Sequence, residues 1–255
     1  ALFRSGGAGW GIAAVSLRSA GTVAALTEQQ GLYTLAIRDI APAYRIIGAH
    51  SRFLAPDDAE QTLALLADPA VRLVTTTVTE KGYCLTADGT LDLSHPDIVH
   101  DLAAPAVPRS VIGWIIAGLA ARQTAGIAPF VVMPCDNLAN NGAKVRAALI
   151  GFAQAHAPDL ATWIATHVRV PGTMVDSITP AADEALYADV AEVLGVEDRA
   201  AVQREAFAQW VIEDLDDPVC AALGRAGATL TDNVAGYEQA KLRILNGSHS
   251  TLAYE

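Results

Sequence analysis

Near its end the chain carries four side chains that could move a proton or stabilise a negatively charged oxygen. They are Glu238, Lys241, Asn246 and His249. On a helix, at about 100° per residue, the last three fall within an arc of about 140°, and Glu238 lies inside it. Leucines share this arc, so the polar groups project from a face that should be buried. Burial without partners is costly, so on a buried face these groups would need either a polar network or a substrate. On periodicity alone the preferred interpretation is an ordinary solvated face with incidental leucines.

A tyrosine four residues before the lysine offers a second interpretation. Tyr237 and Lys241 have the spacing of the tyrosine–lysine pair of short-chain dehydrogenases. The companion serine about a dozen residues upstream is missing, because Gly224 and Arg225 occupy that region. The pattern is also short and common, so it carries little weight.

Three further polar segments could carry chemistry, and two of them, 133–142 and 75–83, lie at the carboxyl ends of expected strands, where open α/β sheets bind ligands. In residues 133–142 (MPCDNLANNG), Asn137 could donate its amide N–H to a developing alkoxide. Asn140 and Asn141 suit a helix N-cap, which is the structural alternative for this segment. Residues 75–83 (TTTVTEKGY) and 171–180 (PGTMVDSITP), the latter with Asp176, are typical of loops when taken alone.

These segments must be held by a regular framework, which the hydrophobic pattern predicts to be α/β. Buried strands are expected at residues 10–17, 33–37, 71–78 and 130–133, alternating with helices at 20–30, 57–67, 110–125 and 143–155. Such alternation implies a parallel sheet covered on both faces. Beyond Pro180 we expect helices at 183–194 and 199–209, extended pieces at 207–212 and 229–234, and a helix from 237 to 252.

The composition of the chain argues against several classes of function. The net charge of −11 opposes binding of nucleic acid, and no apolar run reaches the roughly 20 residues of a membrane helix. The three cysteines lie far apart, so we expect no disulfide framework, no zinc site and a reducing cytoplasm. His95 and His100 with Asp97 and Asp101 could suggest a metal site, but a solvated helix N-terminus is the preferred interpretation.

Six blocks together resemble the long-chain polyol dehydrogenases, the family of mannitol dehydrogenase and fructuronate reductase. The matching text is TVTEKGYCL (77–85), LSHPDIVHDL (93–102), CDNLANNG (135–142), PGTMVDSITP (171–180), FAQWVIED (207–214) and YEQAKLRILNGSHS (237–250). The resemblance implies reversible hydride transfer between NAD(H) and a ketose or keto-hexonate, without metal. The TEKGY and HPDIVHDL wording leans towards fructuronate reductase.

The resemblance also implies roles for individual residues. Lys241 would be the general acid/base, and Asn137 and Asn246 would form the oxyanion hole. His249 would orient the substrate, Asp176 would contact its hydroxyl groups, and Glu238 would serve a proton path. A leucine-rich helix face suits the lysine role, because acid–base work by a lysine requires partial desolvation.

The cofactor is expected to be NAD, with NADP not excluded. Asp39 ends a predicted strand and could hold an adenosine ribose, although Arg38 beside it could favour a 2′-phosphate. Thr79 and Glu80 are further cofactor-binding candidates. A small-molecule sugar or sugar acid is the only partner that these features imply.

The expected fold is a Rossmann-like nucleotide-binding domain at residues 1–232, followed by the start of a mostly helical substrate domain at 233–255. Glycines at 6, 7, 9 and 11 do not fit G-x-G-x-x-G, so the nucleotide-binding domain is expected to lack its glycine-rich turn and the substrate domain to be truncated. Ser177 and Gly236 stand where the family usually has arginine and proline. These departures leave a catalytically inactive nucleotide-binding fragment as the alternative, and a zinc polyol dehydrogenase as a rival enzyme class that the scattered cysteines oppose.

Overall fold

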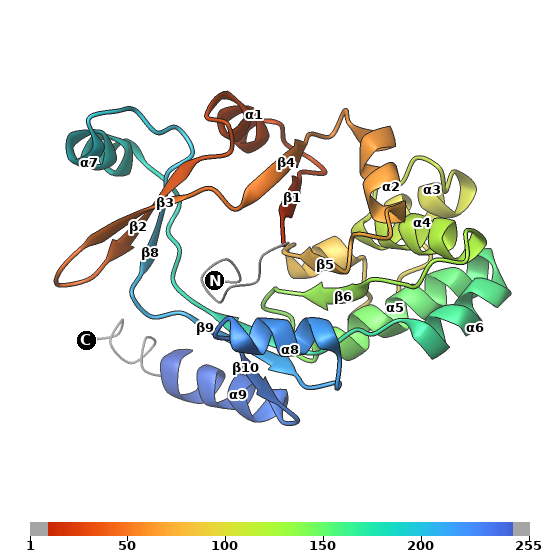
Figure 1. Ribbon diagram of the computed structural model, residues 1–255. Coiled ribbons are helices and arrows are strands. Elements are labelled where there is room, and N and C mark those ends of the chain that lie inside the picture. The colour runs from red at the N-terminus through yellow and green to blue at the C-terminus, as the bar shows by residue number, and fades with distance from the viewer. Residues whose placement is uncertain (1–9, 247–255) are drawn as a thin grey trace. The chain divides into compact units, whose positions relative to one another are not determined.

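The computed structural model describes residues 10–246, with side chains up to residue 243, and it has an α/β fold (Figure 1). The described chain forms two compact units, residues 10–62 with 176–209, and residues 63–175 with 210–246. We refer to them as unit 1 and unit 2 and describe each by itself. Helix α2 (Ala59–Ala67) crosses the boundary between them.

Unit 1 is built around three strands with one helix packed on them. Its elements are β1 (Ile12–Val15), α1 (Gly21–Glu28), β2 (Tyr33–Arg38), β3 (Ala43–Ile47), β4 (His50–Leu54), α7 (Glu184–Leu194) and β8 (Val202–Glu205). Strand β2 pairs with β8 in parallel and with β3 in antiparallel orientation, and β1 pairs with β4 in parallel.

The core of unit 1 lies between β2 and α7. Ala36 on β2 packs with Leu186 and Val190 on α7 and with Ala201 just before β8, and all four are at most 3% exposed. The side chain of Asp183 starts α7 by accepting the backbone N–H of Leu186 at 2.8 Å. This packing brings the end of β2 beside α7.

Unit 2 contains most of the helices. Its elements are β5 (Leu73–Thr76), η1 (Glu80–Tyr83), α3 (Pro96–Ala103), α4 (Val111–Thr124), β6 (Val131–Pro134), α5 (Asn141–His156), α6 (Pro158–His167), β7 (Thr173–Asp176), β9 (Gln209–Glu213), α8 (Pro218–Arg225), β10 (Thr229–Thr231), α9 (Val234–Ala240) and η2 (Lys241–Asn246). Strands β5 and β6 pair in parallel, and a second sheet has the order β10-β9-β7. The last residue of β7 and the first of β9 belong to unit 1.

The core of unit 2 is formed by β6 with α4 and α5. Val132 on β6, Leu119 on α4 and Leu149 on α5 are fully buried. Arg122 is also buried, and its guanidinium donates to the carbonyl oxygens of Leu66 at 2.7 Å and Val71 at 2.8 Å, which compensates the cost of burying the charge. Among residues 10–246, no helix has the length and apolar character needed to cross a membrane.

Most predicted elements are confirmed to within a few residues, and the first four predicted strands correspond to β1, β2, β5 and β6. Three expectations are wrong. Residues 199–209 are not helical, because residues 202–205 pair with β2 as strand β8, and this pairing overrides their helix propensity. The sheet is not purely parallel, because β3 returns antiparallel to β2. Asn140 precedes α5 in a left-handed conformation and makes no side-chain cap.

Several elements were not predicted from the sequence, among them the hairpin strand β3 and strands β4 and β7. Strand β3 (AYRII) is mostly apolar in sequence although three of its five residues are exposed, so burial and sequence pattern disagree there. The predicted domain boundary at residue 233 falls just before α9, and it stays a prediction.

Candidate active site

One buried asparagine holds the start of β7 beside the carboxyl end of β6. Asn141, the first residue of α5, accepts the Thr173 N–H at 2.9 Å and donates to the Thr173 carbonyl at 3.0 Å. Gly142 allows this approach, because a Cβ there would lie 2.5 Å from the backbone nitrogen of Gly172. The helix start, β6 and β7 therefore form one rigid corner in unit 2, and Asn141 serves this corner rather than the helix cap that its sequence suggested.

Lys241 reaches this corner from the end of α9. Its Nζ donates to Asn137 Oδ1 at 3.0 Å and to the Val175 carbonyl oxygen at 2.7 Å. Asn137 follows β6 and Val175 lies on β7, so the lysine joins both strand ends. Because an ammonium group has only donors, it must face the oxygen of the Asn137 amide, which turns the donating NH₂ group to the other side.

Glu238 lies one turn before the lysine, and its carboxylate accepts the backbone N–H of Asn140 at 3.3 and 3.5 Å. It lines a pocket of unit 2 together with Lys241. The pocket is formed by Asp136, Asn137, Leu138, Ala139, Thr173, Met174, Val175, Glu238, Lys241 and Leu242. Three of the predicted site residues, Asn137, Glu238 and Lys241, are thus brought together.

The helix that carries the lysine changes its winding at the lysine itself. Asn233 starts α9 by accepting the Gly236 N–H at 3.0 Å. From Lys241 to Asn246 the chain is π-helical. In such a turn the backbone bonds join residues five apart, so the backbone positions of Lys241 and Asn246 lie one turn apart, closer than the α-helical arc predicted. The side chain of Asn246 and all of His249 lie outside the described part of the chain.

Behind Asn137 lies a buried hydroxyl–carboxylate chain that the sequence did not reveal. Tyr83 OH donates to Asp136 Oδ2 at 2.5 Å, and Thr76 Oγ1 lies 2.5 Å from the same hydroxyl. Burial raises the pKa of Asp136, and the hydrogen bond from Tyr83 opposes this shift. Burial and the Asp136 bond raise the pKa of Tyr83, which therefore stays a neutral donor. The available signal was that both residues follow neighbouring parallel strands.

The other predicted site residues are placed separately. Asp176 is the half-buried last residue of β7 and directly follows Val175. Thr79 and Glu80 are exposed at the start of η1 in unit 2. Asp39 is exposed after β2 in unit 1, where its Oδ1 accepts the Ile40 N–H at 2.7 Å. Their roles stay predictions.

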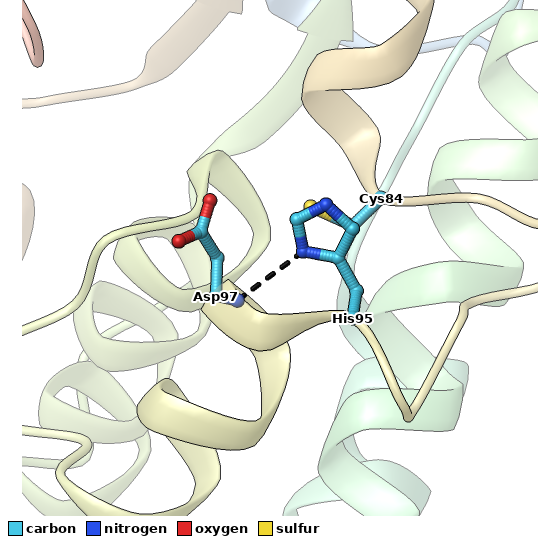
Figure 2. A group of neighbouring side chains, drawn as sticks. All are labelled: Cys84, His95 and Asp97. Atoms are coloured by element: carbon cyan, nitrogen blue, oxygen red, sulfur yellow. Dashed lines mark hydrogen bonds between the residues drawn. The ribbon is translucent and has the colours of Figure 1, made fainter.

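Cys84, His95 and Asp97 place three potential metal-ligand atoms within 4.8 Å of one another (Figure 2). His95 Nδ1, however, accepts the Asp97 N–H at 3.2 Å and caps α3. A neutral imidazole that accepts at Nδ1 carries its proton on Nε2, so in this arrangement neither ring nitrogen offers a lone pair to a metal. His95 and Asp97 lie at the N-terminus of α3, where the interpretation preferred from the sequence put them.

Asp101 is also used structurally, and the expectation that it lies on a solvated surface is wrong. It is fully buried and accepts the Ser110 N–H at 2.9 Å and the Ser110 hydroxyl at 2.6 Å, which ties α3 to the start of α4.

Burial raises the pKa of the Cys135 thiol to about 12 and that of Cys220 to about 11. Without a bound metal these two thiols therefore stay protonated near neutral pH.

Comparisons with known proteins agree on one family. A family model described as the mannitol dehydrogenase Rossmann domain matches residues 3–219, which confirms the Rossmann-like fold class. D-mannonate oxidoreductase of Escherichia coli (strain K12) is 42% identical, covering 99% of this chain and 54% of that relative. Mannitol 2-dehydrogenase of Cereibacter sphaeroides is 43% identical, covering 90% of this chain and 48% of that relative.

A solved structure shows the same likeness. The ternary complex of Pseudomonas fluorescens mannitol 2-dehydrogenase with NAD and D-mannitol has a TM-score of 0.90 and 40% identity. The match covers 97% of this chain and 52% of that one. This chain therefore spans about half the length of the relatives that it matches.

Proposed function

This chain belongs to the mannitol dehydrogenase family, and on that premise we propose that it is part of an NAD-dependent, metal-independent oxidoreductase. The reaction proposed is the interconversion of a ketose or keto-hexonate with its polyol or aldonate. The single observation that carries the proposal is the contact of Lys241 with Asn137 and Val175 at the ends of two strands.

In the proposed reaction Lys241 and the Asn137 amide act on the same substrate oxygen. In reduction, Lys241 would give a proton to the oxygen of the substrate carbonyl, and in oxidation it would remove the proton from the hydroxyl. The Asn137 NH₂ group, turned away from the lysine, would donate to the same oxygen as negative charge develops on it. NAD, when bound, accepts or supplies the hydride.

Four further residues complete the proposed site. Asn246 would be the second donor to the oxyanion, and its backbone position one π-turn from Lys241 supports this role. Glu238 would pass protons between the lysine and water, because its carboxylate lines the same pocket. His249 would orient the substrate and Asp176 would contact its hydroxyl groups, as the family resemblance implies.

Unit 1 supports NAD over NADP. A carboxylate at the end of a Rossmann strand accepts hydrogen bonds from ribose hydroxyls and repels a 2′-phosphate, and Asp39 is exposed at such an end. Arg38, which could instead attract a phosphate, binds Asp189 at 2.6 Å. Thr79 and Glu80, exposed after β5 in unit 2, are proposed as additional cofactor contacts.

We propose a class of substrate rather than one compound. The leading candidates are fructuronate, and mannitol or fructose. One relative is named for mannonate and another for mannitol, and both compounds are open-chain sugar derivatives. A catalytically inactive nucleotide-binding fragment is not favoured, because the relatives are named as oxidoreductases and the pocket holds the lysine and the amide.

The proposal is tested in the complete protein that contains this chain. Fructuronate, tagaturonate, fructose and mannitol are assayed with NADH or NAD, before and after prolonged treatment with EDTA. Lys241→Ala should lower kcat by about 10²–10⁴-fold, the usual contribution of a general acid–base group, while NADH binding is retained. EDTA should have no effect.

Lys144→Ala is the matched control, because it removes the same charge from unit 2 outside the pocket lining. It should leave kcat within about twofold of the wild type, since surface changes away from a site have small effects. Near-normal turnover of Lys241→Ala, or loss of activity with EDTA that zinc restores, would overturn the proposal.

A further inference from the structure

We propose that Tyr83 and Asp136 are positioning residues that hold Asn137 where Lys241 meets it. The inference rests on the proposed function of that site. Tyr83 OH donates to Asp136 Oδ2, and the hydroxyls of Tyr83 and Thr76 are in contact. All three residues are buried, with at most 8% of their surface exposed.

The need for such support follows from the exposure of Asn137. Asn137 itself is exposed, so no surrounding core fixes its backbone. The strand pairing reaches only to Cys135, whose N–H donates to the Thr76 carbonyl at 2.7 Å. Asp136 is the next residue, and its side chain is the last anchored point before Asn137. Tyr83 therefore anchors the chain directly before the residue that meets the lysine.

The chemistry of the pair suits anchoring rather than proton transfer. A tyrosine hydroxyl whose pKa is raised stays protonated at working pH and keeps donating. A short hydrogen bond to a carboxylate is among the stronger protein hydrogen bonds, so the anchor is stiff. The bond and the Lys241 contact lie on two consecutive residues, so a shift of Asp136 carries directly into Asn137.

A purely structural role would make the same bond matter only for stability. The two roles are separated with Tyr83→Phe in the complete protein, which removes the hydroxyl and keeps the ring. If Tyr83 positions Asn137, kcat should fall about 10-fold, because small misplacements of a reacting group cost up to about 10² in rate. The Kd for NADH should stay unchanged.

Ser110→Ala is the matched control. Ser110 also donates its hydroxyl to a buried carboxylate of unit 2, Asp101, at 2.6 Å, but neither residue lines the pocket. This variant should lose thermal stability to a similar degree and keep the wild-type kcat. A Tyr83→Phe variant whose kcat matches that of Ser110→Ala would overturn the inference.

A double-variant cycle asks whether the effect passes through the amide. In an Asn137→Ala background, Tyr83→Phe should lower kcat by less than about twofold further, because residues that act as a unit are not additive. Losses that multiply fully would overturn the inference. If instead Lys241→Ala leaves turnover intact, the proposed function fails and not the positioning role alone.

Two conservative variants keep the test decisive should Tyr83→Phe not fold. Asp136→Asn retains an oxygen for the Tyr83 hydroxyl and should keep more activity than Asp136→Ala. Thr76→Val conserves shape but removes the hydroxyl next to Tyr83, and should lower kcat below that of Ser110→Ala. Equal activity of Asp136→Asn and Asp136→Ala would count against an anchoring bond.

Discussion

Each unit contains a tyrosine that donates to an aspartate, and the two carboxylates respond in opposite ways. In unit 2, Tyr83 bonds to buried Asp136, whose pKa is raised because burial disfavours its charge. In unit 1, Tyr44 bonds to Asp189 at 2.8 Å, and the pKa of Asp189 is lowered, first by the bond from Arg38 and then by that from Tyr44. The tyrosine bond is common to both, so burial and the nearby cation make the difference.

The two pairs therefore differ in energetic cost. The Asp189 pair stabilises the fold, whereas the Asp136 pair includes a carboxylate that is costly to bury. Asp189 is partly exposed and bonded by Arg38 and Tyr44, and it links β2 to α7 at little cost. Asp136 lies in a buried place where its charged form is disfavoured, and its Oδ1 has no hydrogen-bond partner among the described residues. Such a group is more readily explained by what it positions, Asn137, than by the stability that it adds.

Among the changes that probe these two pairs, removal of a tyrosine hydroxyl should have the largest effect on the free energy of unfolding. Tyr83→Phe leaves the buried Asp136 without its hydroxyl donor, which should lower the free energy of unfolding by about 1–3 kcal/mol. Tyr44→Phe should cost less than half of that, because Asp189 retains the Arg38 ion pair and is partly exposed. Urea unfolding of the complete protein at pH 7 measures both, and equal losses would remove the distinction between the two pairs.

The residues of the pocket could be predicted from the sequence because their types and positions carried the signal. Lys241 and Glu238 share a helix face and Asn137 follows a buried strand, and the family resemblance implied that the three act in one site. The structure brings these three together. Asn246 was predicted on the same grounds, but the π-helical turn that places its backbone could not be foreseen from a 3.6-residue period.

The supporting residues could not be predicted from the sequence, because their roles depend on tertiary contacts. Tyr83 and Asp136 are 53 positions apart, and only the parallel pairing of β5 with β6 brings them together. Asn141 was expected to cap a helix and instead joins α5 to β7. Strand β8 has a helix-favouring sequence that its pairing with β2 overrides.

The pH dependence of stability should run in opposite directions for the two carboxylates. A raised pKa means that the native state binds the Asp136 proton more tightly, so this stability is present below the ordinary value of 3.8 and is lost as pH rises through the native pKa. A lowered pKa means that Asp189 contributes stability above 3.8, which is lost as pH falls through its native pKa.

Asparagine variants turn these signs into a measurement. The stability of wild type minus that of Asp136→Asn should fall as pH rises from about 3 to 7, and the corresponding difference for Asp189→Asn should rise and then level off. Urea unfolding across this pH range gives both curves. Two curves of the same slope would show that burial does not set the two pairs apart.

The smallest effect expected concerns the choice of cofactor, which the ion pair in unit 1 should influence. Arg38 is held by Asp189 and stands next to Asp39. Asp189→Asn removes the charge that holds the guanidinium, which should then attract a 2′-phosphate better. We expect kcat/KM with NADPH to rise about 2–5-fold, the scale of an exposed ion pair, with the NADH value little changed. Glu197→Gln is the control, since it removes an exposed unit 1 charge that pairs with Arg199 and not with Arg38. A ratio of NADPH to NADH activity that stays constant in Asp189→Asn, or shifts equally in Glu197→Gln, would mean that the Arg38–Asp189 pair serves only to join β2 and α7.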